Sequence, residues 1–295
     1  MDLRDRRSIS SNTRILGVMG YPIAHSLSPV MFNAAFAELD MDWAYLAWRV
    51  KPGDLHAALE GARSMGLAGA NLTIPLKEMA LEWMDVLSPE ARVIGAVNCV
   101  AVREDKLYGF NTDGEGFLSS LREDAGFEPR GKRVLVVGAG GAARAVAFAL
   151  GRSGCGSLTV ANRTVSRAES LAEHVREATG TVTAGIGLDG SVLGKAVAES
   201  ELLVQTSPVG MYPEDIIPDW FDPGWLDPGS MLVDIIYRPR PTALLRKAAE
   251  LGCSTLDGLG MLVHQAALGF EIWAGGKAPV KVMRDAAIDY LAEFK

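Results

Sequence analysis

Residues 133–143 read RVLVVGAGGAA, a short strand-like run that passes directly into a glycine-rich turn. The run predicts a five-residue strand, Arg133–Val137. Gly138, Gly140 and Ala143 fit the pattern G-x-G-x-x-G/A. In that pattern the first position permits a tight turn, the second lets the backbone approach a pyrophosphate, and the third packs helix on strand. Because a helical pattern follows, the stretch predicts a dinucleotide site at a helix N-terminus; a purely structural turn is the alternative.

The end of the next expected strand, Ser157–Ala161, indicates which dinucleotide is bound. An NAD site usually has Asp or Glu about 20 residues beyond the motif, bonded to the ribose. This chain instead has Asn162, Arg163 and Thr164, with Arg167 one helical step later. Guanidinium groups make charge-assisted bonds to a 2′-phosphate, which a carboxylate would repel. The pattern therefore favours NADP over NAD; two solvated surface arginines are the alternative.

Alternating apolar and amphipathic segments on both sides of this motif predict an α/β fold with two domains. The expected strands of the first series are Ile15–Met19, Ala44–Val50 and Ala68–Ile74, and those of the second are Arg133–Val137, Ser157–Ala161, Leu202–Gln205 and Met231–Ile236. The expected helices are Pro29–Leu39, Asp54–Met65, Arg144–Arg152, Ser166–Glu177, Thr242–Leu251, Leu259–Trp273 and Val280–Glu293. The segment Pro208–Gly229 is expected to be a loop that covers a cofactor.

Composition excludes several classes of protein. The 295-residue chain has a net charge of −7, which gives no electrostatic support to nonspecific nucleic-acid binding. Its apolar stretches are too short for a transmembrane helix, and Met1–Arg14 lacks the apolar core of a secretory signal. Three dispersed cysteines and four histidines without ligand spacing predict a cytoplasmic protein with neither a disulfide framework nor a metal site.

Polar residues that follow the first strands indicate a second ligand. Ser28 followed by Pro29 is typical of a helix start, with the serine as N-cap. Ser26 lies two residues earlier, and capping does not explain it. Two hydroxyls beside a helix N-terminus suit a carboxylate.

Further polar groups follow other short apolar runs. Lys77 ends the run NLTIPLK from Asn71, and Asn98 and Asp113 come later. The carboxyl ends of strands in α/β sheets are where ligands bind, so these groups suit a polyhydroxy compound. Taken singly, each is more often a turn former or a solvated residue.

Together these stretches resemble the shikimate/quinate dehydrogenase family, and shikimate dehydrogenases in particular, from about Thr13 to the end of the chain. The motifs that carry the resemblance stand in family order: GYPIAHSLSP from Gly20, NLTIPLKE from Asn71, GAVN from Gly95, GFNTDG from Gly109, GAGGAAR from Gly138, NRTVSR from Asn162, QTSPVGM from Gln205, DIIYRPRPT from Asp234 and DGLGMLVHQA from Asp257.

The resemblance implies a substrate-binding domain, residues 1–112 plus 258–295, and a Rossmann-like NADP-binding domain, residues 113–257, with a cleft between them. It also implies reversible NADPH-dependent reduction of 3-dehydroshikimate to shikimate, on the route to chorismate and aromatic amino acids. The implied partners are a small-molecule substrate and NADP, and the implied assembly is a monomer or homodimer.

The resemblance also assigns roles to residues. Lys77 would transfer the proton, with Asp113 as its partner. The residues implied on the substrate side are Ser26 and Ser28 for the carboxylate, Asn98, Asp113 and Gln265 for the ring hydroxyls, and Asn71, Thr73 and Tyr237 nearby. Those implied on the cofactor side are Gly138, Ala139, Gly140, Gly141 and Ala142 for the pyrophosphate, Asn162, Arg163, Thr164 and Arg167 for the 2′-phosphate, and Thr206, Ile235 and Gly258 beside the nicotinamide.

Three positions depart from the family pattern. Phe32 stands where a polar residue is common, Cys99 where Thr is common, and Gln205 where Asn is common. They leave open a relative that prefers quinate or an aminoshikimate, although the paired serines favour shikimate. The more distant alternatives are a methylenetetrahydrofolate dehydrogenase, which leaves Ser26 and Ser28 unexplained, and a non-catalytic NADP- or metabolite-binding protein, which need not keep Lys77 with Asp113.

Overall fold

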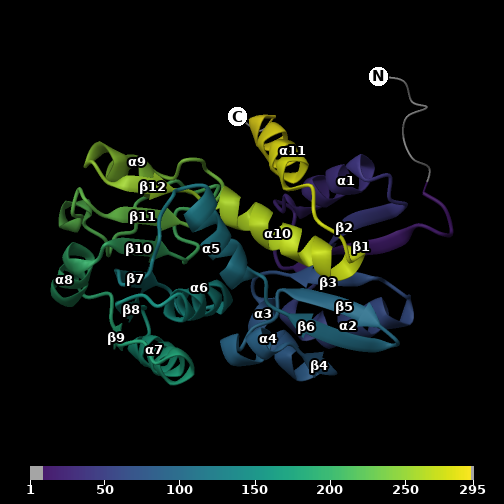
Figure 1. Cartoon of the computed structure of the whole chain (residues 1–295), viewed down its shortest axis with the longest axis horizontal. Coiled ribbons are helices and arrows are strands. Elements are labelled where there is room, and N and C mark those ends of the chain that lie inside the picture. Colours follow the sequence, from purple (N-terminus) through teal and green to yellow (C-terminus); the bar gives the residue numbers. More distant parts are fainter. Residues whose placement is uncertain (1–8, 294–295) are drawn as a thin grey trace. The chain divides into compact units, whose positions relative to one another are not determined.

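A computed structural model describes residues 9–293, which form two compact units (Figure 1). One unit contains the described residues up to Thr112 and those from Ala266 onward, and the other is Asp113–Gln265. The family resemblance implies domain boundaries at 112/113 and 257/258; the compact units part at 112/113 and inside helix α10 (Leu259–Ala274). A continuous helix carries no turn residue to mark such a boundary, so the sequence pattern does not reveal it.

The second unit is built on a parallel sheet with the strand order β12-β11-β10-β7-β8-β9 (Figure 1). Its strands are β7 (Arg133–Val137), β8 (Ser157–Ala161), β9 (Thr183–Ile186), β10 (Leu202–Gln205), β11 (Met231–Asp234) and β12 (Ser254–Leu256). Every neighbouring pair is parallel. This is the doubly wound order of dinucleotide-binding domains, and the strand order reverses between β7 and β10. The expected Rossmann-like domain is therefore confirmed.

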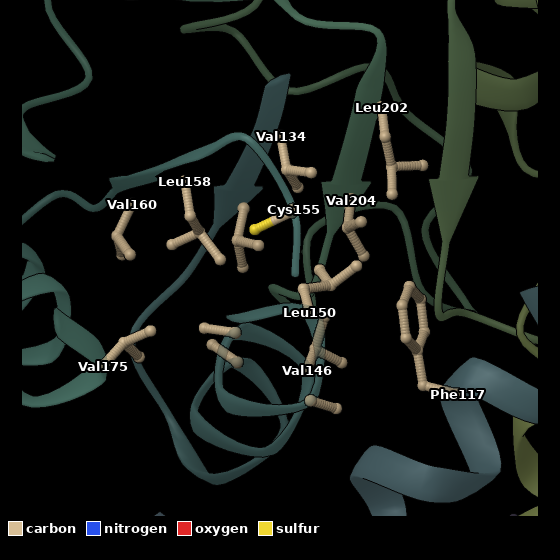
Figure 2. Close-up of a cluster of buried hydrophobic side chains, with 14 of the residues drawn as sticks. Phe117, Val134, Val146, Leu150, Cys155, Leu158, Val160, Val175, Leu202 and Val204 are labelled. Carbon is tan, nitrogen blue, oxygen red and sulfur yellow. The ribbon is translucent and has the colours of Figure 1, made fainter. Parts of the chain in front are cut away.

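Apolar side chains cover both faces of this sheet. The helices of the unit, besides the start of α10, are α5 (Asp113–Glu123), α6 (Gly141–Arg152), α7 (Val165–Thr179), α8 (Gly190–Glu199) and α9 (Ala243–Glu250). On one face Val134 and Val204 meet Val146 of α6 and Phe117 of α5 (Figure 2). On the other face, alternate strand residues such as Leu203 pack with residues of α8 and α9. A sheet buried on both faces explains why its strands read as continuous apolar runs.

The first unit has a mixed sheet with the order β2-β1-β3-β5-β6-β4. Its strands are β1 (Arg14–Gly20), β2 (Trp43–Arg49), β3 (Gly69–Leu72), β4 (Val86–Leu87), β5 (Cys99–Arg103) and β6 (Lys106–Phe110), and its helices, besides the end of α10, are α1 (Ser28–Glu38), α2 (Leu55–Ser64), α3 (Leu76–Met79), α4 (Pro89–Ile94) and α11 (Val280–Ala292). β1 is parallel to β2 and β3, and β4 is parallel to β6, as expected for a mainly parallel sheet.

The β5–β6 hairpin introduces the antiparallel pairs of this sheet. Its turn is Glu104-Asp105, both residues with positive φ. Turns of this kind usually use Asn-Gly or Asp-Gly, so the hairpin lacked its usual sequence signal.

The predicted loop Pro208–Gly229 lies in the second unit. The structure describes all of its residues, and they include one short 3₁₀ turn, η4 (Pro223–Trp225). Within residues 9–293, no helix has the length and apolar character to cross a membrane.

A buried carboxyl group lies at the end of β11. The Asp234 carboxyl accepts hydrogen bonds from the Thr242 hydroxyl (2.8 Å) and the Ile236 N–H (3.1 Å). Thr242 in turn accepts the Leu245 N–H at the start of α9 (3.3 Å). Burial raises the pKa of Asp234 to about 7, although both hydrogen bonds act in the opposite direction. The folded chain therefore holds a proton that the unfolded chain releases near pH 4.

We expect the contribution of Asp234 to the free energy of unfolding to fall as pH rises from about 4 to about 7, because only the folded state keeps the Asp234 proton in that window. This group contributes at most ~1.4 kcal/mol per pH unit. Asp234→Asn keeps a hydrogen-bond acceptor without the titration, so its stability relative to wild type should increase across the window. Urea unfolding from pH 4 to 8 measures this, with Asp105→Asn in the exposed hairpin turn as the control. Parallel pH profiles for wild type and Asp234→Asn would contradict it.

Candidate active site

The glycine-rich turn joins β7 to α6 with the geometry that its motif predicts. Gly138 has φ +121°, and a Cβ there would lie 2.3 Å from Thr206 Oγ1. Gly140 is the N-cap residue of α6, and a Cβ there would meet nothing within 4 Å. No side chain at this position caps the first N–H groups of the helix. Gly138 is thus required by the fold, whereas Gly140 leaves open space over the first N–H groups of the helix, where an anion fits.

The remaining residues of this turn have different surroundings. Ala139 and Ala143 are buried in the core cluster, which confirms the packing role expected for Ala143. Gly141 and Ala142, at the start of α6, are half-buried. Gly141 and Ala142 are therefore partly accessible to solvent, and Gly140 beside them is exposed.

The residues expected at the 2′-phosphate follow β8. Arg163 and Thr164 are exposed, and Asn162 Nδ2 donates to the Thr164 carbonyl (3.0 Å). Arg167, in the first turn of α7, donates from Nη2 to the carbonyl of Ala139 (3.0 Å). The structure therefore brings Arg167 to the glycine-rich turn, and the exposed Arg163 lies at the end of the neighbouring strand. These cations, with the open space at Gly140, fit a dinucleotide that carries a 2′-phosphate.

The residues implied beside the nicotinamide follow the carboxyl ends of three strands: Thr206 follows β10, Ile235 follows β11 and Gly258 follows β12. Thr206 Oγ1 donates to the Val137 carbonyl (2.6 Å), so this residue is bonded to the end of β7. A Cβ on Gly258 would lie 1.9 Å from the Ile235 carbonyl oxygen, so Gly258 and Ile235 are in direct contact. Carboxyl ends of parallel strands are the ligand-binding edge of such a sheet.

The helix start in the first unit differs from the one predicted. Ser28 is the first residue of α1, and Leu27 before it already has helical φ and ψ. Ser28 is therefore not the N-cap; its N–H instead donates to Ser26 Oγ (3.3 Å). The interpretation of Ser28 as the cap was wrong, because the chain enters the helical conformation one residue earlier than the Ser-Pro signature suggests.

A buried hydrogen-bond network joins several predicted residues of this unit. The Tyr45 hydroxyl donates to Asn71 Oδ1 (2.6 Å), and the Ser28 side chain lies near the phenol and lowers its pKa. Asn71 Nδ2 donates to the carbonyl of Asn98 (3.0 Å). The Asn98 side chain accepts the Thr112 N–H (2.7 Å) and donates to its hydroxyl (2.9 Å). One network thus links β2, β3 and the residue before β5, and Ser28 at the start of the first helix lies beside it.

Tyr45 is a member of this network that the sequence did not single out. Its burial raises the pKa of its phenol well above the ordinary value, and nearby Cys99 raises it further. The phenol therefore stays neutral and keeps its proton as a hydrogen-bond donor. Phe32 stacks on its ring (centroids 4.3 Å apart), and Asn33 bonds both backbone groups of Tyr45. Two departures from the family pattern, Phe32 and Cys99, hence lie around Tyr45.

Thr73 and Lys77 lie close in sequence to Asn71, a member of this network. Lys77 is half-buried near the start of α3, and its carbonyl accepts the N–H of Val97, next to Asn98 (2.8 Å). Thr73 follows β3, and its N–H donates to the carbonyl of Met19 in β1 (3.0 Å). The backbone therefore brings these residues to the ends of β1, β3 and β5.

Three other predicted residues belong to the second unit. Asp113 is buried at the start of α5, and Gln265 Nε2 donates to the Leu262 carbonyl (2.8 Å). Burial raises the pKa of Tyr237 to about 12, and Arg238 acts in the opposite direction. The expected partnership of Asp113 with Lys77 remains a prediction. Among the described residues, no group of three or more His, Cys, Asp or Glu side chains is arranged for a metal ion.

The doubly wound sheet, with its glycine-rich turn where the strand order reverses, defines a dinucleotide-binding α/β protein. Three family models match the chain: the shikimate dehydrogenase substrate binding domain over residues 18–100, shikimate / quinate 5-dehydrogenase over 122–188, and the shikimate 5′-dehydrogenase C-terminal domain over 258–288. The chain belongs to the shikimate dehydrogenase family.

Individual relatives are similar over nearly their whole length. The shikimate dehydrogenase (NADP(+)) of Methanopyrus kandleri is 46% identical and covers 96% of this chain and 98% of its own. A crystal structure of a shikimate dehydrogenase with NADP⁺ has a TM-score of 0.88 at 35% identity, covering 96% of this chain and 97% of that one. The Thermus thermophilus enzyme with NADP(H) and shikimate has a TM-score of 0.84 at 39% identity, covering 94% and 99%.

The two glycines of the turn should respond differently to an added methyl group. Gly140→Ala has room for its Cβ and should keep its thermal stability, but it should bind NADPH roughly tenfold more weakly, since one lost backbone hydrogen bond costs about 1.4 kcal/mol. Gly138→Ala should lose stability as well, because φ +121° and contact with Thr206 exclude a Cβ. Thermal melts and fluorescence titration with NADPH test both variants. Unchanged NADPH affinity in Gly140→Ala would remove the pyrophosphate assignment.

Proposed function

We propose that this chain is a shikimate dehydrogenase that reversibly reduces 3-dehydroshikimate to shikimate with NADPH, on the route to chorismate and aromatic amino acids. The observation that supports the substrate class is the buried network of Tyr45, Asn71 and Asn98 in and next to the first unit's strands, with Ser28 beside it. Hydroxyl and amide groups held in fixed directions suit a small ring with several hydroxyls and a carboxylate.

The substrate carboxylate binds to the hydroxyls of Ser26 and Ser28 in this proposal. Both lie at the N-terminus of α1, whose dipole favours an anion. Asn98, Asp113 and Gln265 bond the ring hydroxyls, with Asn71, Thr73 and Tyr237 nearby. A buried amide or hydroxyl left without its partner is costly, so these groups also select against rings that lack the matching hydroxyls.

NADPH would supply the hydride when bound and would leave as NADP⁺, and the protein supplies position and a proton. Negative charge develops on the carbonyl oxygen of 3-dehydroshikimate during the reduction. The Lys77 ammonium stabilises this charge and donates the proton, and Asp113 is its partner. In the direction of shikimate oxidation, the same amine accepts the hydroxyl proton.

The cofactor selectivity of the proposal rests on charge. Residues 138–142 hold the pyrophosphate, and Asn162, Arg163, Thr164 and Arg167 hold the adenosine 2′-phosphate. Thr206, Ile235 and Gly258 border the nicotinamide. The proposed setting is the cytoplasm, with a small-molecule substrate as the partner and a monomer or homodimer as the assembly.

A direct test is the absorbance of reduced nicotinamide after the purified protein is mixed with shikimate or quinate and with NADP⁺ or NAD⁺. We expect the fastest reaction with shikimate and NADP⁺. Faster turnover with quinate or NAD⁺ would overturn the proposed specificity. Folded protein that is silent in all four mixtures would overturn the activity.

Replacing Lys77 by Ala should lower turnover by roughly 10²- to 10⁴-fold, the usual contribution of a general acid or base. The affinity for NADPH should change little, because Lys77 is not among the residues proposed to hold the pyrophosphate, the 2′-phosphate or the nicotinamide. Steady-state kinetics measure the first quantity and fluorescence titration the second. The control is Lys106→Ala, at an exposed lysine of the first unit, which should keep wild-type turnover. Near-normal turnover in Lys77→Ala would exclude the proposed role.

A further inference from the structure

Gln205, one of the departures from the family pattern, is a buried amide at the carboxyl end of β10. The residue is 1% exposed. Oε1 accepts the Ser207 N–H at 2.7 Å, and Nε2 donates to the carbonyls of Ser207 and Val209, each at 3.2 Å. The nitrogen and the oxygen of the amide are therefore both used, and all three bonds go to the backbone of the loop that follows the strand.

These three bonds define the shape of that loop. Residues 206–209 fold back over the end of their own strand, and the Val209 N–H donates to Ser207 Oγ (3.4 Å). Without the Gln205 amide, the Ser207 N–H and two carbonyls would lose their side-chain partner. Ser207 and Val209 are half-buried, and backbone groups shielded from water are costly without a partner, so the loop would adopt another conformation to reach water.

The loop carries Thr206 to the glycine-rich turn. The Thr206 N–H and hydroxyl both donate to the carbonyl of Val137, at 2.9 and 2.6 Å. Thr206 Oγ1 also lies only 2.3 Å from the position that a Cβ on Gly138 would take. Thr206 contacts the glycine-rich turn, and Gln205 fixes the backbone that follows it, at Ser207 and Val209.

β7 and β10 are the neighbouring strands between which the strand order reverses. Dinucleotides bind across the crevice at such a point, with one half on each side. Resting on the proposed function, we propose that Gln205 is a positioning residue for the nicotinamide half of NADP, because its amide sets the loop 206–209. The side-chain bonds of Gln205 go to this loop and not to the arginines after β8, so the adenosine half does not depend on it.

The experiment compares two ligands on one folded protein: NADPH, which fills the whole site, and adenosine 2′,5′-bisphosphate, which fills only the adenosine half. Gln205→Leu keeps a side chain of similar size and removes all three bonds. We expect its Kd for NADPH to rise at least tenfold and its kcat to fall. Its Kd for adenosine 2′,5′-bisphosphate should stay within about twofold of wild type. Calorimetry measures both affinities.

Two further variants separate positioning from general stability. Val204→Ala removes packing from a fully buried neighbour on the same strand and should lower the melting temperature while both affinities stay near wild type. Gln205→Asn keeps the amide on a side chain one methylene shorter and should give an intermediate NADPH affinity. It also serves as the test if Gln205→Leu does not fold.

Two outcomes would overturn the inference: unchanged NADPH affinity and kcat in both Gln205 variants, or equal weakening of both ligands. Wild-type protein that binds neither ligand would instead overturn the proposed function itself. The two failures are therefore distinguishable in one series of titrations.

Discussion

The parallel pairing of β7 with β10 is the constraint on which the second unit depends. It places the reversal of strand order between two strands whose carboxyl ends are both followed by tight loops. Gly138 makes the first of these loops possible, because its positive φ and absent Cβ leave room for Thr206. A side chain at that position would separate the two loops, and the helix N-terminus beyond them would no longer face the same edge.

The first unit meets a different physical demand, since it buries polar groups and must satisfy them. Tyr45, Asn71 and Asn98 are each at most 5% exposed, and each has hydrogen-bond partners. An isolated buried amide or phenol would destabilise the unit by about 1–3 kcal/mol. Joined in a network they are held in fixed orientations, which is the property that a site for a polyhydroxy acid requires.

Much of the fold was predictable because its signals are local. The strands β7, β8 and β10 have the bounds that the apolar runs predict, and the glycine pattern marks the first turn correctly. The β5–β6 hairpin was not predicted, because Glu104-Asp105 is not a usual turn pair. The role of Ser28 was misassigned, because the conformation of Leu27 decides where the helix begins. Tyr45 resembled any other aromatic residue of a strand.

The sequence by itself determined the α/β class, the place of the dinucleotide turn and the sign of charge after β8, because each depends on residues that are neighbours in the chain. Only the tertiary structure decided that Tyr45 bonds Asn71, 26 residues away, and that Thr206 meets Gly138. Those contacts depend on strand order and register, which are properties of the packed sheet. The amide of Gln205 is an intermediate case: its partners are two and four residues away, yet only burial at the strand end turns it toward them.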